Sequence, residues 1–531
     1  MAEQQQPIYV ISDSTRTSGR DAQRNNILAA KIVAETVRTT LGPKGMDKML
    51  VDSLGDIIVT NDGVTILEEL SVEHPAAKMI VEVAKTQESE VGDGTTTAVV
   101  FAGELLKRAE SLLDKNVHPT SIVRGYRLAA EEAQKILKKL GRSVSADDTA
   151  LLKNIALTAM TGKGAEVAKE HLSSLVVDAV RLIGVHSSTL EDVSIEKKSG
   201  ASIHDTELIK GLLLDKERVH SGMPLSVKNA KIALLDIALE VRSPETDAKI
   251  QITDPSQFQS FLDMEERMFK DMVDSVVSSG ANVVLCQKGI DDLAQHYLAK
   301  KGIYACRRVK KSDMEKLAKA THGTIITNLK ELSKEDLGAA GFIEEISVGD
   351  DKMTMVKDCV NPKAVTLLVR GGTHHVIEEV ERALHDAVGD LCSAIKYGKV
   401  VAGAGSCEVE LAKQLRTYAH SLQGREQLAV LSFADSLEII PTTLAENAGL
   451  DPIDTLTELK AAHERGEVSA GLDVFTGKVV DAWAQSIIEP LQIKVQAVQS
   501  ASEVAEMILR IDDVLAAKKP KASSVPDVND M

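Results

Sequence analysis

The stretch Val91-Gly92-Asp93-Gly94-Thr95-Thr96-Thr97 places one carboxylate between two glycines, directly before three hydroxyl side chains. Apolar residues then recur from Ala98 to Leu106 at the spacing of one helix face, which predicts a helix that begins at Thr95. The first turn of such a helix has backbone N–H groups without intrahelical partners, and these groups attract an anion together with the helix dipole. The two glycines let a ligand approach the main chain closely. The stretch therefore predicts an anion site.

Asp93 gives this predicted anion site its chemical character. A carboxylate repels a phosphate unless a cation lies between them, and Mg²⁺ bound by carboxylates and phosphate oxygens is the usual arrangement. The motif therefore favours a magnesium nucleotide over a bare anion. The alternative interpretation is purely structural: Asp93-Gly94 forms a turn, and Thr95 is the N-cap of the following helix.

The composition indicates a large globular protein and limits its partners. The chain has 531 residues, 44% of them hydrophobic, and a mean hydropathy of −0.05, which is enough for about three domains. Lys and Arg number 62 against 79 for Asp and Glu, and the net charge of −17 disfavours nucleic acid and anionic membrane as partners. No apolar run approaches the roughly 20 residues that span a bilayer.

The cysteines and the start of the chain indicate a compartment. The five cysteines are far apart and form no Cys-x-x-Cys pair, and the polar start MAEQQQPIYV contains no secretory apolar segment. A reducing cytosol is the simplest location, so we expect a cytoplasmic protein.

The order of sequence patterns predicts a domain inserted into another domain. Residues 25–143 are mostly helical, with Gly42 expected as the C-cap of the first helix and a short strand at 57–59. Residues 282–326 show a β-α-β-α-β rhythm, which indicates a separate α/β domain. The chain is helical again from about 400, before a charged tail at 518–531 that we expect to be disordered.

Two glycine-containing dipeptides are candidate crossing points between these domains. Gly371-Gly372 and Ser199-Gly200 lie near the ends of the α/β region. They are interpreted either as hinges or as ordinary turns.

Three further loops carry groups that suit a nucleotide. Thr40-Leu41-Gly42-Pro43-Lys44-Gly45 presents backbone and an ammonium, Thr60-Asn61-Asp62-Gly63 presents a second carboxylate, and Gly403-Ala404-Gly405 precedes a helix. Each loop alone is also explained as a helix stop or a turn. Neither a Walker A pattern nor an intact Gly-x-Gly-x-x-Gly occurs, which disfavours P-loop and dinucleotide folds.

Two other clusters have a functional and a structural interpretation. A His-rich helix could hold a metal, but it lacks His-Glu-x-x-His, so a solvated face is favoured over zinc; its members are His374, His375, Glu378, Glu379, His385 and Asp386. An aromatic and methionine stripe at helical spacing is either core or an adaptable apolar surface for partners; its members are Phe258, Phe261, Met264, Met268, Phe269 and Met272.

Together these motifs resemble those of a chaperonin subunit, and the similarity covers essentially the whole chain. The resemblance is carried by LGPKG at 41–45, TNDGVTIL at 60–67, EHPAAKM at 73–79, GDGTTT at 92–97 and the loop at 403–405. Within that family the chain is most similar to group II, the archaeal thermosome and its eukaryotic cytosolic relatives, through KTQESEVGDGTTT, TGKGAE, ERALHDAV and IEPLQIK.

This resemblance implies a multidomain α and α/β fold. The implied domains are an equatorial ATPase domain (1–150 and 400–531), an intermediate domain (151–214 and 368–399), and an apical substrate-binding domain (215–367). The resemblance also implies that residues of about 243–275, which carry the Phe/Met stripe, form a helical protrusion that serves as a built-in lid.

The resemblance further implies the roles of individual residues. Asp93 would bind Mg²⁺, Asp62 and Asp386 would position the attacking water, and Lys163 would sense the terminal phosphate. The remaining residues would contact ATP: Leu41, Gly42 and Pro43; Gly94, Thr95, Thr96 and Thr97 at the phosphates; Gly403, Ala404 and Gly405; and Glu489 and Lys494 on the nucleoside side. Ala404 is a departure, because the family commonly has three glycines there, and its methyl could crowd the nucleotide.

The implied function is ATP-dependent protein folding in two stacked rings of identical or paralogous subunits. Non-native polypeptides would be the clients, and movement of Asp386 onto the equatorial site would couple hydrolysis to closure. Two alternatives stay open at this point: a metabolic enzyme whose α/β domain binds a small substrate, and a passive holdase without turnover.

Overall fold

The computed structural model describes residues 14–51, 55, 57–70, 72–184, 192–240, 255–348 and 351–517. The expected disordered tail at 518–531 and the first part of the expected protrusion lie outside these residues. The chain forms two compact units, Met1–Gly141 with Val401–Gln485 and Ile493–Met531, and Arg142–Val400 with Ser486–Gln492. We call them unit 1 and unit 2. The three-domain boundaries expected from the sequence stay a prediction.

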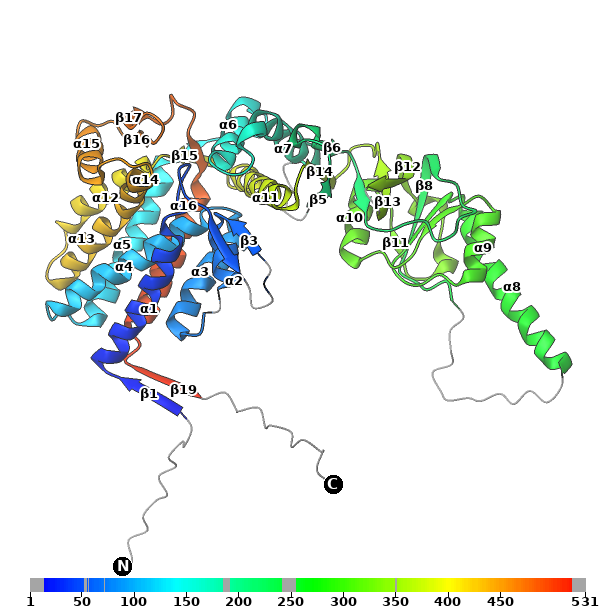
Figure 1. Ribbon diagram of the computed structural model, residues 1–531, viewed down its shortest axis with the longest axis horizontal. Coiled ribbons are helices and arrows are strands. Elements are labelled where there is room, and N and C mark those ends of the chain that lie inside the picture. Colours follow the sequence, from blue (N-terminus) through cyan, green and yellow to red (C-terminus); the bar gives the residue numbers. More distant parts are fainter. Residues whose placement is uncertain are drawn as a thin grey trace, which may run out of the picture. The chain divides into compact units, whose positions relative to one another are not determined.

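Unit 1 is mainly helical and contains both ends of the described chain, which pair as strands β1 and β19 (Figure 1). Its elements are β1 (Ser14–Ser18), α1 (Arg20–Arg38), β2 (Lys48–Val51), β3 (Ile57–Thr60), α2 (Gly63–Glu69), α3 (Pro75–Val91), α4 (Thr95–Asp114), α5 (Pro119–Leu140), α12 (Ser406–Ala419), α13 (Arg425–Leu437), α14 (Ile439–Asn447), α15 (Pro452–Glu464), β16 (Ala470–Asp473), β17 (Lys478–Asp481), α16 (Leu491–Leu509, from Ile493) and β19 (Asp513–Ala517).

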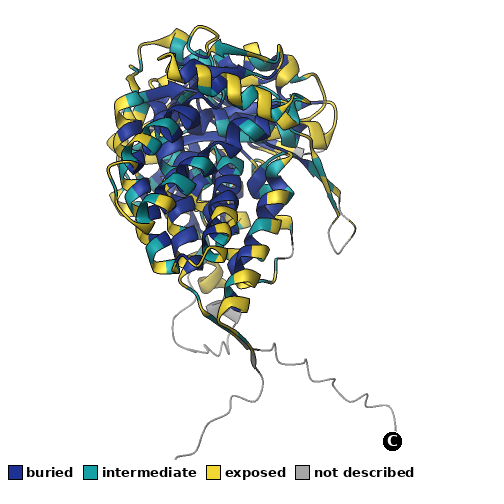
Figure 2. Cartoon of the chain, turned by 90° about the vertical axis from the view of Figure 1, so that its left-hand side faces the viewer, coloured by how far each residue is buried: buried dark blue, intermediate teal, exposed yellow. Residues whose placement is uncertain are grey.

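An aromatic cluster fixes helix α4 in the core of unit 1. Phe101, Tyr126 and Phe433 are almost fully buried. The ring of Phe433 lies 5.4 Å from that of Phe101 and 5.7 Å from that of Tyr126, both edge to face. The Tyr126 hydroxyl donates to the carbonyl of Leu105 at 2.8 Å. Figure 2 shows that the neighbouring helices have buried residues on their inner faces and exposed residues on their outer faces. The start of α4 is therefore attached to a rigid core.

One segment of unit 1 corrects the sequence expectation about apolar runs. The helical segment Arg425–Asn447, which covers α13 and α14, is long and apolar enough to cross a membrane by length and composition alone. Its most apolar window is 72% buried inside the protein, because its apolar side chains, including Phe433, pack into the core. A core helix passes the same test of length and composition.

Unit 2 combines helices with two main sheets. Its elements are β4 (Arg142–Ser143), α6 (Thr149–Met160), α7 (Lys169–Ile183), β5 (Val193–Ser199), β6 (Glu207–Ile209), β7 (Leu212–Leu214), β8 (Ser226–Leu235), α8 (Pro255–Ser279), β9 (Val283–Cys286), α9 (Asp292–Lys300), β10 (Tyr304–Cys306), α10 (Lys311–Thr321), β11 (Ile325–Ile326), β12 (Gly338–Val348), β13 (Asp351–Lys357), β14 (Val365–Gly371), α11 (His374–Tyr397), β15 (Lys399–Ala402, which ends in unit 1) and β18 (Ile488–Pro490). Short 3₁₀ helices lie at Glu166–Ala168, Ile203–Asp205, Leu329–Glu331 and Lys334–Asp336.

The larger sheet confirms the predicted β-α-β-α-β pattern. Its strand order is β10-β9-β8-β12-β13-β7, with β11 also paired to β8. Strands β8 to β11 pair in parallel, and β12 and β13 add antiparallel neighbours. Alternate residues of β8 enter opposite cores: Leu234 joins the core that α10 covers, and Leu235 joins the core that α8 and α9 cover. Helices on both faces bury the parallel strands.

The smaller sheet of unit 2 brings the two candidate crossing points together. Its order is β5-β14-β6, with β5 parallel to β14. At the end of this pair the N–H of Gly200 donates to the carbonyl of Gly371 at 2.9 Å. The two candidate crossing points, far apart in sequence, thus lie at adjacent strand ends. Their role as hinges stays a prediction.

The Phe/Met stripe divides between core and surface along helix α8. Phe269 is fully buried and Met272 packs against the same core. By contrast Phe261, Met264 and Met268 are 42%, 58% and 39% exposed. The side chain of Phe258 lies outside the described residues. The core interpretation is therefore confirmed for Phe269 and Met272, and the partner surface stays a prediction for the exposed residues.

Candidate functional site

The first turn of α4 begins at a left-handed glycine. Gly92 (φ 84°) ends α3 and Gly94 (φ 79°) is the N-cap of α4, so Asp93 lies alone between two left-handed residues. The Asp93 Oδ1 atom accepts a hydrogen bond from the Gly94 N–H at 2.6 Å. The interpretation of Thr95 as N-cap is wrong, because the N-cap is Gly94, a residue without a side chain that could cap the helix. The first turn of α4 therefore has the N–H groups that an anion site requires.

A buried glutamine fixes the turn that contains Asp93. The side chain of Gln87, which is fully buried, donates from Nε2 to the carbonyl of Asp93 at 2.9 Å and to that of Ile493 at 3.2 Å. A Cβ atom at Gly94 would lie 2.5 Å from the side chain of Ile493. Gln87 was not singled out from the sequence, because its position on an apolar helix face gives no signal of a role.

The second carboxylate turn lies directly against the first turn of α4. Asp62 is the N-cap of α2, and its Oδ2 atom accepts from the N–H and the hydroxyl of Thr65 at 2.8 and 2.7 Å. A Cβ atom at the next residue, Gly63, would lie 2.6 Å from the hydroxyl oxygen of Thr96 and 3.3 Å from that of Thr95. The fold thus brings together two motifs that are 30 residues apart in sequence.

The loops at 41–43 and 403–405 are both attached to α14. A Cβ atom at Gly42 would lie 2.2 Å from Leu444 Cδ2, and the Asn447 side-chain amide donates to the carbonyl of Leu41 at 2.9 Å. A Cβ atom at Gly405 would lie 3.0 Å from Pro441. The prediction of Gly42 as a C-cap is wrong: α1 ends with Thr39 as its C-cap, and Gly42 is required by its close approach to Leu444.

Ala404 has a left-handed backbone and lies against strand β16. Its φ is 58°, a region that glycine occupies more easily. The Leu472 N–H donates to the Ala404 carbonyl at 2.9 Å, and a Cβ atom at Gly471 would lie 2.8 Å from the Ala404 methyl. The sequence analysis missed β16. The available signal was Gly471 inside a short strand pattern, which often indicates close backbone approach.

Lys494 forms a buried ion pair next to the start of α4. Its Nζ lies 2.9 Å from Glu408 Oε1, and both side chains are almost fully buried. These two residues line a small, mainly apolar cavity together with Thr97 and Phe101. The charge of Lys494 is therefore balanced by Glu408, a residue in the first turn of α12 that the sequence analysis did not select.

Negative charge accumulates beside the Asp62 turn. The pKa of Glu88, on α3, is raised by burial and further by the carboxylates of Asp62 and Glu68. These groups repel one another, and a divalent cation near Asp62 would relieve that repulsion.

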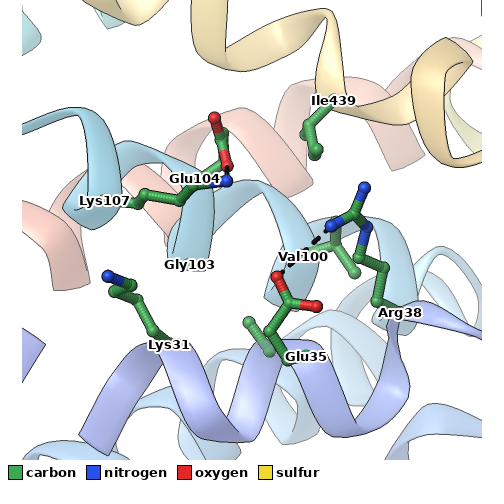
Figure 3. A pocket seen from close by; sticks show the side chains of 9 residues that line it. Lys31, Glu35, Arg38, Val100, Gly103, Glu104, Lys107 and Ile439 are labelled. Carbon is green, nitrogen blue, oxygen red and sulfur yellow. Dashed lines mark hydrogen bonds and ion pairs between the residues drawn. The ribbon is translucent and has the colours of Figure 1, made fainter. Parts of the chain in front are cut away.

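A second depression of unit 1 lies between α1, α4 and α14 (Figure 3) and contains none of the predicted site residues. Each of its cations faces a carboxylate: Lys31 lies 3.0 Å from Glu110, Arg38 3.3 Å from Glu35, and Lys107 2.9 Å from Glu104. Its charges are balanced, so it is less suited to a phosphate than the first turn of α4.

In unit 2 the structure pairs Lys163 with Asp386. Lys163 follows α6, Asp386 lies on α11, and their charged groups form an ion pair, with side chains 24% and 17% exposed. A Cβ atom at Gly164 would lie 2.7 Å from Glu379 Cβ, so this loop packs closely on α11. Glu489 lies in β18, and its side chain is partly buried. Two residues that are 223 positions apart in sequence thus meet.

Comparison with known proteins identifies the family. Residues 33–519 match the model of the TCP-1/cpn60 chaperonin family. The chain belongs to this family. The prediction of a group II chaperonin subunit is confirmed, and so is the predicted multidomain α and α/β fold.

The curated relatives and the solved structure similar to this chaperonin subunit are chaperonin subunits as well. It is 62% identical to thermosome subunit beta of Archaeoglobus fulgidus over 97% of this chain and 96% of that one. It is 61% identical to a thermosome subunit of Methanopyrus kandleri over 95% and 93% of the two chains. An open-state monomer of a group II chaperonin from Methanococcoides burtonii matches with a TM-score of 0.59 and 51% identity, over 79% of this chaperonin subunit and all of that chain.

Proposed function

We propose that this chaperonin subunit binds and hydrolyses Mg-ATP and uses that cycle to fold non-native polypeptides inside a double ring in the cytoplasm. The observation that carries the ATPase proposal is the first turn of α4, which begins at the N-cap Gly94 and lies between the turns of Asp62 and Asp93. Helix N–H groups and threonine hydroxyls suit phosphate oxygens, and the two carboxylates suit a hard divalent cation.

The residues of this site fit Mg²⁺ and a nucleotide. Asp93 would hold the Mg²⁺, which neutralises phosphate charge when bound. Because Gly63 has no side chain, its backbone can lie close against the hydroxyls of Thr95 and Thr96, where a Cβ atom would clash. The loops at 41–43 and 403–405, together with Lys494 and Glu489, would contact the rest of the nucleotide.

Hydrolysis requires a group that positions the attacking water. Asp62 and Asp386 are the proposed groups, and Lys163 is the proposed sensor of the terminal phosphate. Because Lys163 pairs with Asp386, a terminal phosphate that attracts Lys163 would release the Asp386 carboxylate to accept a hydrogen bond from water. The pair thus offers a way to make catalysis depend on the nucleotide.

Client binding is assigned to unit 2. We propose the three domains at the boundaries given above, with α8 as part of the lid protrusion. The exposed Phe261, Met264 and Met268 form an apolar, adaptable surface on this helix. Such a surface suits non-native chains of varied sequence better than one small substrate.

The test is ATP-coupled refolding by the purified assembly. We expect elution near a megadalton in gel filtration, stacked rings in negative-stain electron microscopy, and recovery of a denatured client that needs hydrolysable ATP. Recovery without hydrolysis would make the protein a passive holdase, and a small monomeric species with no ATPase activity would contradict the proposal.

A further inference from the structure

A buried ion pair lies behind the loop at 403–405. His463, near the end of α15, is fully buried, and Glu410 on α12 is 5% exposed. The His463 Nδ1 atom lies 2.8 Å from Glu410 Oε2, and its Nε2 atom lies 2.9 Å from the carbonyl oxygen of Ala470. Both ring nitrogens therefore face oxygen acceptors.

This geometry determines the protons on the ring. A carbonyl oxygen cannot donate, so Nε2 carries a proton that it donates to Ala470. The hydrogen bond from His463 is the main cause that lowers the pKa of Glu410, with further contributions from Gln414 and Lys413, against the effect of burial. On its other side the ring is joined to Glu410 by the 2.8 Å hydrogen bond between Nδ1 and Oε2.

The surrounding polar groups complete this network. Gln414 Nε2 donates to Glu410 Oε1 at 2.8 Å, and Lys413 Nζ donates to the His463 carbonyl at 2.5 Å. Lys413 also lies 4.0 Å from Glu464. Buried ion pairs contribute little net stability compared with apolar residues of similar volume. Stability alone is therefore a weak reason for this pair.

The pair connects two elements that both contact the loop at 403–405. Glu410 belongs to α12, whose N-cap is Gly405. His463 fixes the carbonyl of Ala470 in β16, and two residues later Leu472 donates to the carbonyl of Ala404 at 2.9 Å. A continuous series of contacts therefore runs from α12 to His463, from His463 to β16, and from β16 to the loop at 403–405, which directly precedes α12.

We infer that His463 is a positioning residue for nucleotide binding: by donating from Nε2 to Ala470, it holds β16 against Ala404 and so sets the shape of the loop at 403–405. The inference rests on the proposed contact of this loop with ATP. His463 does not touch the nucleotide in this scheme; it acts through β16.

The decisive variant replaces both charges, Glu410→Met with His463→Leu. It leaves no unpaired buried charge, so we expect it to assemble and melt within a few degrees of the unchanged protein. It lacks the hydrogen bond to Ala470, and we expect Mg-ADP to bind about tenfold more weakly, with faster amide exchange at Leu472. The KM for ATP should rise by a similar factor, with kcat within about threefold.

Two further variants separate the effect of the hydrogen bond to Ala470 from the effect of the charge on Glu410. In Glu410→Gln a neutral His463 still donates from Nε2 to Ala470, so Mg-ADP affinity should stay within about threefold. In Gly471→Ala the added methyl, 2.8 Å from that of Ala404, pushes β16 from the loop and should reproduce the tenfold loss without altering the buried pair. This variant keeps the inference testable if the double variant does not fold. Glu438→Gln, at the end of α13, is the control.

Unchanged Mg-ADP affinity in an assembled Glu410→Met/His463→Leu variant would overturn the inference, as would unchanged affinity in Gly471→Ala. A loss in the Glu438→Gln control equal to that in the double variant would also count against it. If the unchanged protein itself fails to bind Mg-ADP, the proposed function fails instead, so the two failures are distinguishable.

Discussion

The start of α4 in unit 1 and the Lys163–Asp386 pair in unit 2 differ in how their residues come together. Asp93 and the three threonines that follow are neighbours in sequence, and the turn between α3 and α4 arranges them around the N-cap Gly94. Lys163 and Asp386 are 223 positions apart and meet only because the loop after α6 packs on α11. The first arrangement suits binding, which needs fixed donors, and the second suits regulation, since an ion pair is exchanged more easily than a helix end is rebuilt.

Replacing Asp93 tests the local arrangement and has the largest expected effect. In Asp93→Ala we expect at least about a 100-fold loss of Mg-ATP affinity in calorimetry, because the proposed magnesium ligand is removed. Glu90→Ala, an exposed carboxylate on the neighbouring helix, is the control and should bind normally. Undiminished Mg-ATP binding in Asp93→Ala would show that the nucleotide site does not lie at the start of α4.

Replacing Asp386 tests the long-range pair and should separate turnover from binding. We expect Asp386→Ala to bind Mg-ATP within about threefold of the unchanged protein and to lose roughly 100-fold or more in steady-state hydrolysis. Glu378→Gln, on the same helix, should retain turnover. If Asp386→Ala hydrolysed ATP at the full rate, the Lys163–Asp386 ion pair would have a structural role and no role in catalysis.

Replacing Gln87 tests how far the local arrangement depends on the core behind it. Gln87→Leu leaves the carbonyls of Asp93 and Ile493 without their buried donor. We expect about 2 kcal/mol lower stability towards denaturant and weaker Mg-ATP binding. Equal stability and affinity would mean that the α3–α4 turn is fixed by its two glycines alone.

Replacing Ala404 has the smallest expected effect. Ala404→Gly removes the left-handed strain but adds freedom to the unfolded chain, so we expect a change in unfolding free energy below about 1 kcal/mol. Mg-ATP affinity should stay within about twofold if the nucleotide contacts the backbone here. A large gain in affinity would show that the Ala404 methyl crowds the nucleotide.

Local patterns predicted several elements because these elements depend on neighbouring residues. The helix from Thr95, the strand predicted at 57–59 and the alternating strands and helices of 282–326 followed from periodicity and turn residues. The C-cap at Gly42 was wrong, because a glycine after a helix signals either a helix end or a close approach, and here Leu444 decides. No local pattern could decide which part of the α8 stripe is buried.

The amino-acid order was enough to identify the family, the fold class and the helix start that would bind phosphate, since these depend on motifs and on the chemistry of adjacent residues. The packing of Gly63 on Thr96, the balance of Lys494 by Glu408 and the connection of α12 to β16 by His463 became visible only in the folded chain. Such contacts join residues distant in sequence, and burial, which no single segment encodes, gives them their strength.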